Sequence, residues 1–245
     1  MTNQVVAKMN RKALLILSFL IFSLIAVAQQ RSISRYESSK SELWAGATIG
    51  VSRMLEDAPD SLVQEIQDFY NGLRTGWNYG FEAEFYINRY LGFGAKYSRF
   101  ITKKEADSIV IQIFTTKYFI DISSEMSIHT FSPIVLGKLP LLHDRLTLTG
   151  GIGPAWLFYR NIGKAVGDTN MFKGSSPGLS AMFRVNYQIV PRLSIALEGN
   201  YIHAFLKEFT RDNGITEEVI KLDKENYQNI SRLEFSFGMF YTFRF

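Results

Sequence analysis

The sequence contains no cysteine, and this absence excludes two kinds of site. Without a thiol in its 245 residues, the chain can form neither a disulfide framework nor a metal site with thiolate ligands. Long apolar runs are scarce as well. Residues 13–25 form one run without a charge, but no stretch approaches the roughly 20 apolar residues that a membrane-spanning helix needs. Any lasting insertion into a membrane must therefore use strands.

The one apolar run has the features of an export signal. Lys8, Arg11 and Lys12 precede it without any acidic residue, and Ala-Val-Ala at residues 26–28 follows it. A basic start, a short apolar core and an A-x-A site are typical of a secretory signal peptide. The predicted segments are a cleaved signal peptide (1–28), a periplasmic N-terminal segment (29–42) and the folded domain (43–245).

Net charge is small once the signal peptide is removed. Lys and Arg then fall from 27 to 24, against 23 Asp and Glu, so the high isoelectric point comes largely from the segment that is discarded. A nucleic-acid partner would require a clear excess of positive charge, and we predict none. The mature length of about 217 residues fits one domain.

The sequence is rich in segments where apolar and polar residues alternate. In residues 77–87 the odd positions are Trp, Tyr, Phe, Ala, Phe and Ile, and the even ones include Glu82 and Glu84. Alternation over about ten residues is the pattern of a membrane-spanning strand. It recurs in residues 77–87, 91–100, 179–189, 193–201 and 232–245. Less regular strands are predicted at 43–52, 127–138 and 146–158, the last two with a proline that marks a bulge or bend.

Connections between these strands alternate strictly in length. The short ones are residues 88–90, 139–145 and 190–192, and the long ones are residues 53–76, 102–126, 159–178 and 202–231. Tight periplasmic turns and long extracellular loops are typical of outer-membrane barrels. We therefore predict an all-β fold, an eight-stranded antiparallel transmembrane β-barrel in the outer membrane with long extracellular loops.

A soluble lipocalin-type barrel is the alternative, because alternation alone does not say which face points inward. The export signal and the many aromatic residues of the apolar rows favour the membrane barrel. The last strand must then pair with the first, since an open edge cannot exist in lipid, and its apolar row faces lipid to the end. Phe243 and Phe245 are predicted to be the aromatic assembly signal read by the barrel-assembly machinery.

Three stretches carry a resemblance to a known family: LWAGATIGVS (43–52), HTFSPIVLGK with LTLTGGIGPAWLFY (129–159), and FSFGMFYTFRF (235–245). They resemble the small outer-membrane β-barrel family of Bacteroidetes, often called PorT-like, over nearly all of the mature chain. The usual Ile-Pro or Leu-Pro is Ser132-Pro133 here. The resemblance implies the fold, whereas most members of the family have no assigned function.

Charged residues on the predicted inward rows form the candidate site. Counted with Arg244, they comprise four acids and four bases, a balance that is expected of groups that must pair in a barrel without bulk water. Lys96 is the nearest cation in sequence order to Glu82 and Glu84, and Arg244 at the periplasmic mouth is expected to be solvated. The predicted lumen charge network consists of Glu82, Glu84, Lys96, Arg184, Glu198, Arg232 and Glu234.

Catalytic, metal and cofactor sites are not predicted. A serine nucleophile needs an adjacent base, but His143 lies in a turn, His203 has the phase of the outer aromatic girdle, and His129 lacks a positioned acid although it shares the inward phase of Ser127. The acidic groups near Asp212-Asn213-Gly214 lack the spacing of a calcium loop. Asn-Gly after Asp more simply predicts a hairpin turn.

Two long loops have patterns of their own. In the loop Arg53–Gly76, Ser61 and Gln64 form a possible capping box. Leu62, Ile66, Phe69 and Leu73 follow at helical spacing, which predicts a short amphipathic helix on the barrel rim or, alternatively, a contact for a protein partner. Residues 108–114 and 117–123 are strand-like, and they either project as a hairpin or extend the third and fourth strands.

Three functions are compatible with the sequence. The first is a structural or interaction barrel with a filled lumen and no catalysis, the second a narrow channel for small solutes or ions, and the third a lipid-modifying enzyme. Eight strands leave an interior just wide enough for side chains, which favours the first. The expected partners are outer-membrane lipid and lipopolysaccharide, together with the assembly machinery during insertion.

Overall fold

The computed structural model describes residues 41–56, 64–113, 116–142, 144–165 and 168–244; for residues 64–65, 107–113, 116–121 and 165 it describes the backbone alone. The predicted signal peptide and nearly all of the periplasmic segment lie outside the described residues. So do Ser61 and Leu62 of the expected helix start, His143 and the terminal Phe245. In the described part of the chain, no helix is long and apolar enough to cross a membrane.

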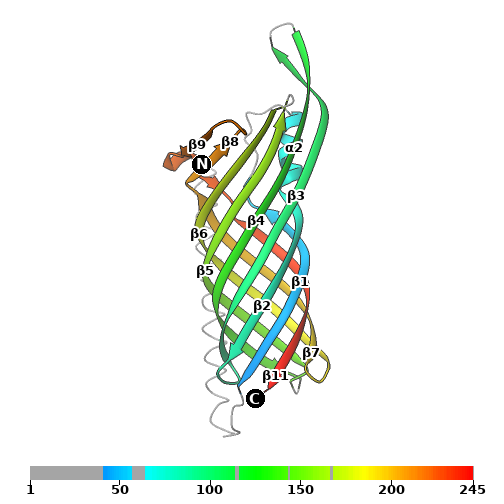
Figure 1. Cartoon of the computed structure of the whole chain (residues 1–245). Helices are drawn as coiled ribbons and strands as arrows, with labels where there is room; N and C mark the ends of the chain where they lie inside the picture. The colour runs from blue at the N-terminus through cyan, green and yellow to red at the C-terminus, as the bar shows by residue number, and fades with distance from the viewer. Residues whose placement is uncertain (1–40, 57–63, 114–115, 143, 166–167, 245) are drawn as a thin grey trace, which may run out of the picture. The chain divides into compact units, whose positions relative to one another are not determined.

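Eight long strands form a closed antiparallel barrel (Figure 1). Each strand pairs with the next, and β11 closes the ring by pairing with both β7 and β1. The strands are β1 (Glu42–Met54), β2 (Thr75–Tyr86), β3 (Leu91–Ile113), β4 (Thr116–Leu141), β5 (Leu146–Ala165), β6 (Asp168–Val190), β7 (Leu193–Leu206) and β11 (Arg232–Arg244). All eight predicted strands are therefore confirmed, and most of them extend beyond the predicted bounds.

Glycines let the first and last strands meet. β1 pairs with β11 over its whole length, from Glu42 opposite Arg244 to Met54 opposite Arg232. A Cβ on Gly46 would lie 2.3 Å from the Phe240 ring, and one on Gly50 would lie 1.9 Å from a backbone oxygen of β11. Because neither distance is compatible with a side chain, these glycines allow β11 and its inward Phe240 to lie close against β1.

Both ends of the barrel follow the predicted asymmetry. The short-turn end carries the connections around residues 88–90, 142–145 and 191–192, where Leu142, Asp144 and Arg192 adopt positive φ. At the opposite, long-hairpin end, β3–β4 and β5–β6 continue as paired strands to residues 113–116 and 165–168. Figure 1 shows the β3–β4 hairpin extending farthest beyond the ring.

Two of the expected loops are therefore wrong in kind. Residues 102–126 and 159–178 were predicted as connections, yet most of them are strand. Ile109 to Ile113 of β3 pair with Thr116 to Ile120 of β4, which is the predicted alternative in which the third and fourth strands are extended. These connections were predicted too long because the strands of each hairpin remain paired beyond the segments in which apolar and polar residues alternate.

The remaining long-hairpin connections contain short elements. α2 (Gln64–Leu73) precedes β2, and β8 (Glu208–Asp212) pairs with β9 (Glu217–Lys221) as the predicted hairpin around Asp212-Asn213-Gly214. Asn213 Oδ1 accepts the backbone N–H of Ile215 and of Thr216 within this turn. β8 pairs with β6, and a short η2 helix (Lys224–Asn226) and β10 (Gln228–Asn229) lead back to β11.

Candidate functional site

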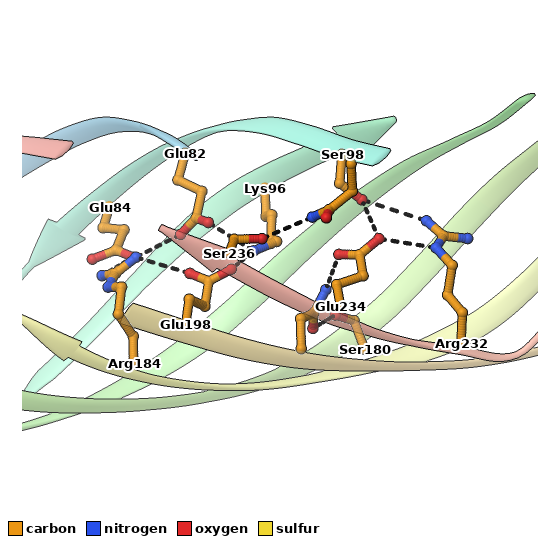
Figure 2. Close-up of polar contacts among 12 residues, drawn as sticks. Glu82, Glu84, Lys96, Ser98, Ser180, Arg184, Glu198, Arg232, Glu234 and Ser236 are labelled. Carbon is orange, nitrogen blue, oxygen red and sulfur yellow. Dashed lines mark hydrogen bonds and ion pairs between the residues drawn. The ribbon is translucent and has the colours of Figure 1, made fainter. Parts of the chain in front are cut away.

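The even-numbered residues of β2, β3, β6, β7 and β11 point into the barrel and bring the predicted charges together. Buried and exposed positions alternate along β2, β7 and β11 as predicted from the sequence. Every member of the predicted lumen charge network is at most 4% exposed. Figure 2 shows the network as one row of facing side chains, made up of Glu82, Glu84, Lys96, Arg184, Glu198, Arg232 and Glu234.

Arg184 is the centre of the network. Its Nη1 donates to Glu82 Oε2 at 2.6 Å and its Nη2 to Glu84 Oε1 at 2.5 Å, so one guanidinium bridges two carboxylates of the same strand. The guanidinium also lies 3.9 Å from the centroid of the Phe240 ring. This pairing explains how two acids two residues apart on β2 are tolerated, because a planar fork can bind both at once.

Lys96 forms the second bridge. Its Nζ donates to Glu82 Oε1 at 2.7 Å and also to Glu198, which joins β2 to β7 across the lumen. From the sequence, Lys96 is the nearest cation in chain order to Glu82 and Glu84, and it does pair with Glu82. Glu84 pairs instead with Arg184 of β6. The strands β2 and β6 are not neighbours in the ring, and their inward side chains meet across the lumen.

Arg232 and Glu234 form a second polar layer nearer the long-hairpin end. Arg232 Nε donates to Glu234 Oε1 at 2.9 Å, and Arg232 Nη2 donates to Thr130 Oγ1 at 2.6 Å. Ser98 and Asn200 donate to the two oxygens of Glu234. These hydroxyl and amide partners were not identified from the sequence, since Ser, Thr and Asn on inward rows look like ordinary lumen polar residues.

Apolar layers close the lumen on both sides of the charges. Toward the long-hairpin end, inward residues from β1, β3, β4, β5 and β7 and one residue from the segment before β11 form one packed cluster: Met54, Phe100, Met126, Ile128, Ala155, Leu157, Tyr159, Ile202, Ala204, Leu206 and Ile230. Toward the short-turn end, a smaller cluster consists of Trp44, Tyr86, Ile134, Leu136, Met182, Ala196 and Phe240. The charge network therefore lies between two apolar layers.

An ion pair follows the second apolar layer at the short-turn mouth. Lys138 Nζ donates to Glu42 Oε2 at 2.5 Å and lies 4.1 Å from the Tyr86 ring centroid and 5.0 Å from that of Trp44. Arg244 also pairs with Glu42, but its side chain is 50% exposed, which agrees with the solvated position expected for it. Without Arg244, the lumen charge network contains four acids and three bases, all of them buried.

A family comparison matches residues 17–243 to the outer membrane protein beta-barrel domain. The chain belongs to this family. Because the match covers nearly the whole sequence, the barrel is an outer-membrane β-barrel and its outward apolar rows face lipid. The narrower PorT-like group suggested by the sequence stays a prediction. Among curated proteins, no match to the chain is found.

Solved structures with the same fold are distant in sequence. A major outer membrane protein from Thermus thermophilus is 16% identical, with a TM-score of 0.55, and the match covers 83% of this chain and 99% of that one. OprG from Pseudomonas aeruginosa is 10% identical, with a TM-score of 0.50 over 84% of this chain and 96% of its own. OmpT, an outer membrane protease from Escherichia coli, is 11% identical over 84% and 96%, with a TM-score of 0.45. The similarity to the Thermus thermophilus protein and to OprG shows the fold of the outer-membrane barrel alone.

The two described histidines of this outer-membrane barrel both point outward. His203 faces outward as predicted, and its Nδ1 lies 3.2 Å from Ser231 Oγ and 3.2 Å from Tyr201 Oη. His129 was expected to face the lumen, and this is wrong. It pairs with Arg99 on the outer face, and its Nδ1 lies 2.7 Å from Tyr97 Oη. The phase assigned to this strand was inverted, because its even residues, such as Ile128 and Thr130, face the lumen. Ser127 shares the outward phase of His129, although it is buried.

No metal site is found in the described part of the barrel. Among these residues, no group of three or more His, Asp or Glu could hold an ion. Asp212 Oδ1 instead accepts the backbone N–H of Gly214, so the acidic group near the β8–β9 hairpin serves its turn. Phe243, half of the predicted assembly signal, faces outward at the end of β11, opposite Leu43.

The α2 helix lies at the long-hairpin rim of the barrel. Phe69 and Leu73 of its predicted apolar stripe are buried, which confirms the amphipathic helix. The neighbouring Glu56 is partly buried, and burial raises the pKa of its carboxyl above the ordinary value of 4.5, against the opposing effects of the Asn229 amide and the Arg74 charge. Asn229 N donates to Glu56 Oε1 at 3.4 Å.

Proposed function

We propose that this protein is a structural or interaction barrel of the outer membrane with a closed lumen and no catalytic role. The observation that carries the proposal is the filling of the lumen in successive layers. An apolar cluster, the buried charge network and a second apolar cluster follow one another along the barrel axis. An eight-stranded barrel has an interior just wide enough for such side chains.

The arrangement of the charges supports a closed rather than a conducting lumen. A path for ions would present one sign of charge to water, whereas here Glu82, Glu84 and Glu198 all pair with Arg184 or Lys96 at contact distance. Because both partners of each pair are already bound to each other, passing ions would have to break contacts between buried charges.

The proposed orientation places the long-hairpin end outside the cell and the short-turn end in the periplasm, as is usual for such barrels. The interaction surface is then formed by the β3–β4 and β5–β6 hairpins and by the loop Arg53–Gly76. Since Phe69 and Leu73 of α2 are buried, a protein partner at this loop would contact the exposed face around Tyr70.

Planar-bilayer recording of the purified barrel tests the proposal. We expect no steady single-channel conductance, whereas reproducible ohmic channels from the unmutated protein would overturn the closed lumen and favour a channel. Mass spectrometry of lipid A from a deletion strain tests the absence of catalysis. A change in acyl or phosphate composition that the restored gene reverses would contradict it.

A further inference from the structure

The outward rows of three neighbouring strands change from aromatic to polar or basic residues toward the long-hairpin end. Along β5 the successive outward residues are Trp156, Phe158 and Arg160, of which Trp156 is 47% and Phe158 57% exposed. Along β3 the outward Tyr97 is followed by Arg99, and β4 has His129 beside Arg99. Aromatic girdles lie at membrane interfaces, so these basic residues lie at the level of the lipid headgroups.

Strand register brings the basic residues into one patch, which we call the basic rim. Arg99 of β3 lies opposite His129 of β4, Ser127 of β4 lies opposite Arg160 of β5, and Arg160 lies opposite Lys173 of β6. Neighbouring strands are roughly 4.8 Å apart, so the basic rim is about 14 Å wide. Its basic residues are Arg99, His129, Arg160 and Lys173, and the buried Ser127 lies between the two rows.

The basic rim is only partly neutralised within the chain. Arg160 and Lys173 are directly opposed, which is unfavourable for two like charges. Lys173 Nζ lies 3.7 Å from Asp212 Oδ2, while Arg160 forms no ion pair with any described residue. Beyond this row on β3 and β4, Lys103 pairs with Glu105 at 2.7 Å and lies opposite Glu125, so its charge is compensated there.

Arg99 has an unused donor in this patch. Its Nη1 donates to Tyr79 Oη at 2.9 Å, which holds the guanidinium at the aromatic level. Its Nε is buried and lacks a hydrogen-bond partner among the described residues. A lipid cannot reach this buried atom, but Nη2 of Arg99 is not buried and makes no hydrogen bond with a described residue. Nη2 is therefore the donor available to a phosphate oxygen, an acceptor that suits a guanidinium.

We propose that the basic rim binds the phosphate groups of lipid A in the outer leaflet. Arg160 and Lys173 would contact one phosphate between them, which removes their mutual repulsion, and Arg99 would donate to a second phosphate or to the glycan beside it. Trp156 and Phe158 then lie against the acyl chains below. This proposal rests on the proposed orientation, with the long-hairpin end outside the cell, but not on the closed lumen. Lipid binding therefore tests the basic rim, whereas conductance tests the closed lumen.

Lipid retention tests the basic rim. The purified chain is placed in phosphatidylcholine nanodiscs containing diphosphorylated lipid A, dephosphorylated lipid A or phosphatidylglycerol, and the lipid that remains bound after detergent extraction is measured by native mass spectrometry. We expect retention of diphosphorylated lipid A alone. The double variant Arg160→Ala, Lys173→Ala should weaken it about tenfold, as two lost contacts of up to roughly 0.7 kcal/mol each imply.

Arg53→Ala is the matched control, because Arg53 is also exposed near this end of the barrel but lies on β1, away from the basic rim. Its retention should equal that of the unmutated chain. Equal retention of dephosphorylated lipid A or of phosphatidylglycerol would overturn the assignment, and so would an equal loss in the Arg53→Ala control. The double variant should fold about as well as the unmutated chain in lipid-free detergent, since it loses the like-charge pair of Arg160 and Lys173 together with the partly exposed Lys173–Asp212 pair. Arg160→Gln alone should give an intermediate retention of lipid A.

Discussion

At the scale of single residues, Arg184 is the side chain on which the lumen most depends. It is fully buried and contacts Glu82, Glu84 and the ring of Phe240. Buried ion pairs of this kind add little net stability compared with apolar residues of the same volume, but removing one partner leaves the others charged in a dry environment. The network is therefore sensitive to single changes on either side.

We expect Arg184→Met to destabilise the folded barrel by roughly 3–5 kcal/mol, because Glu82 loses one of its cations and Glu84 the only one that pairs with it in the described chain. Urea unfolding of the barrel refolded in lipid vesicles, followed by tryptophan fluorescence, measures the change. Arg89→Met is the control. Arg89 forms an exposed ion pair with Asp144, and its loss should cost at most about 1 kcal/mol. Equal losses of unfolding free energy in the two variants would contradict the interpretation of Arg184 as a buried, paired charge.

Glu56 gives a residue-scale prediction for pH. Because burial raises its pKa in the folded barrel, the folded state binds this proton more tightly than the unfolded chain does. The stability that Glu56 contributes is therefore fully present below pH 4.5 and is lost as pH rises through the raised pKa. Glu56→Gln should match the unmutated barrel at acidic pH and be more stable at neutral pH. Urea unfolding curves of both proteins, recorded from acidic to neutral pH, measure this difference in stability. A variant that is less stable than the unmutated barrel at neutral pH would contradict the prediction.

At the scale of one element, β11 shows how strictly the two faces of a strand are separated. Its odd residues face lipid and its even residues fill the lumen from Arg232 to Thr242. The sequence predicts this separation because strand side chains alternate with a period of two, and the register then places each row on one face over the whole length.

Depth in the membrane should decide how well a charge is tolerated on the outward row of β11. Phe237→Arg, in the middle of the row, should cost roughly 2–4 kcal/mol, and Tyr241→Arg, nearer the short-turn end, about 0–1 kcal/mol. Both side chains are outward and exposed, so the comparison holds the face constant. Unfolding free energies in lipid vesicles give the two values. A larger loss of stability for Tyr241→Arg would show that Tyr241, and not Phe237, lies nearer the membrane midplane.

At the scale of the whole molecule, the two long hairpins differ in how they are tied to the barrel. Beyond Ala106 and Ile122, β3 and β4 pair only with each other in the described part of the chain. In β5–β6, by contrast, Ile162 pairs with Glu125 of β4, and Phe172 pairs with β8 and packs against the apolar cluster. An isolated two-stranded hairpin adds little stability, so only the second hairpin should support the barrel.

Replacing residues 107–121 with Asn-Gly tests this difference. Ala106 and Ile122 are register partners, so a two-residue turn can join them without moving the barrel strands. We expect refolding yield and urea midpoint to remain unchanged. The matched control joins Arg160 and Lys173 by Asn-Gly, removes residues 161–172 and should lower both values. If the first deletion destabilises the barrel as much as the second, the outer part of the β3–β4 hairpin must contact the rest of the barrel in ways that strand pairing does not show.

Much of the barrel follows from the sequence because its signals are local. The alternating segments predict the number of strands and which residues face inward, and the order of short and long connections predicts the end at which the long hairpins lie. The same alternation predicts that Glu82, Arg184, Glu198 and Glu234 share the lumen, since facing depends only on the parity of a residue within its own strand.

Tertiary structure alone decided the pairing inside the lumen and the patch outside it. Arg184 reaches Glu84 across the interior, and this contact depends on the curvature and closure of the barrel rather than on neighbouring strand order. The basic rim depends on register: Arg160 lies opposite Lys173 only because β5 and β6 remain paired through residues that the sequence predicts to be a loop. The parity of a side chain is a property of one strand, whereas its partner is set by the stagger between strands, which backbone hydrogen bonds determine only when the whole ring has closed.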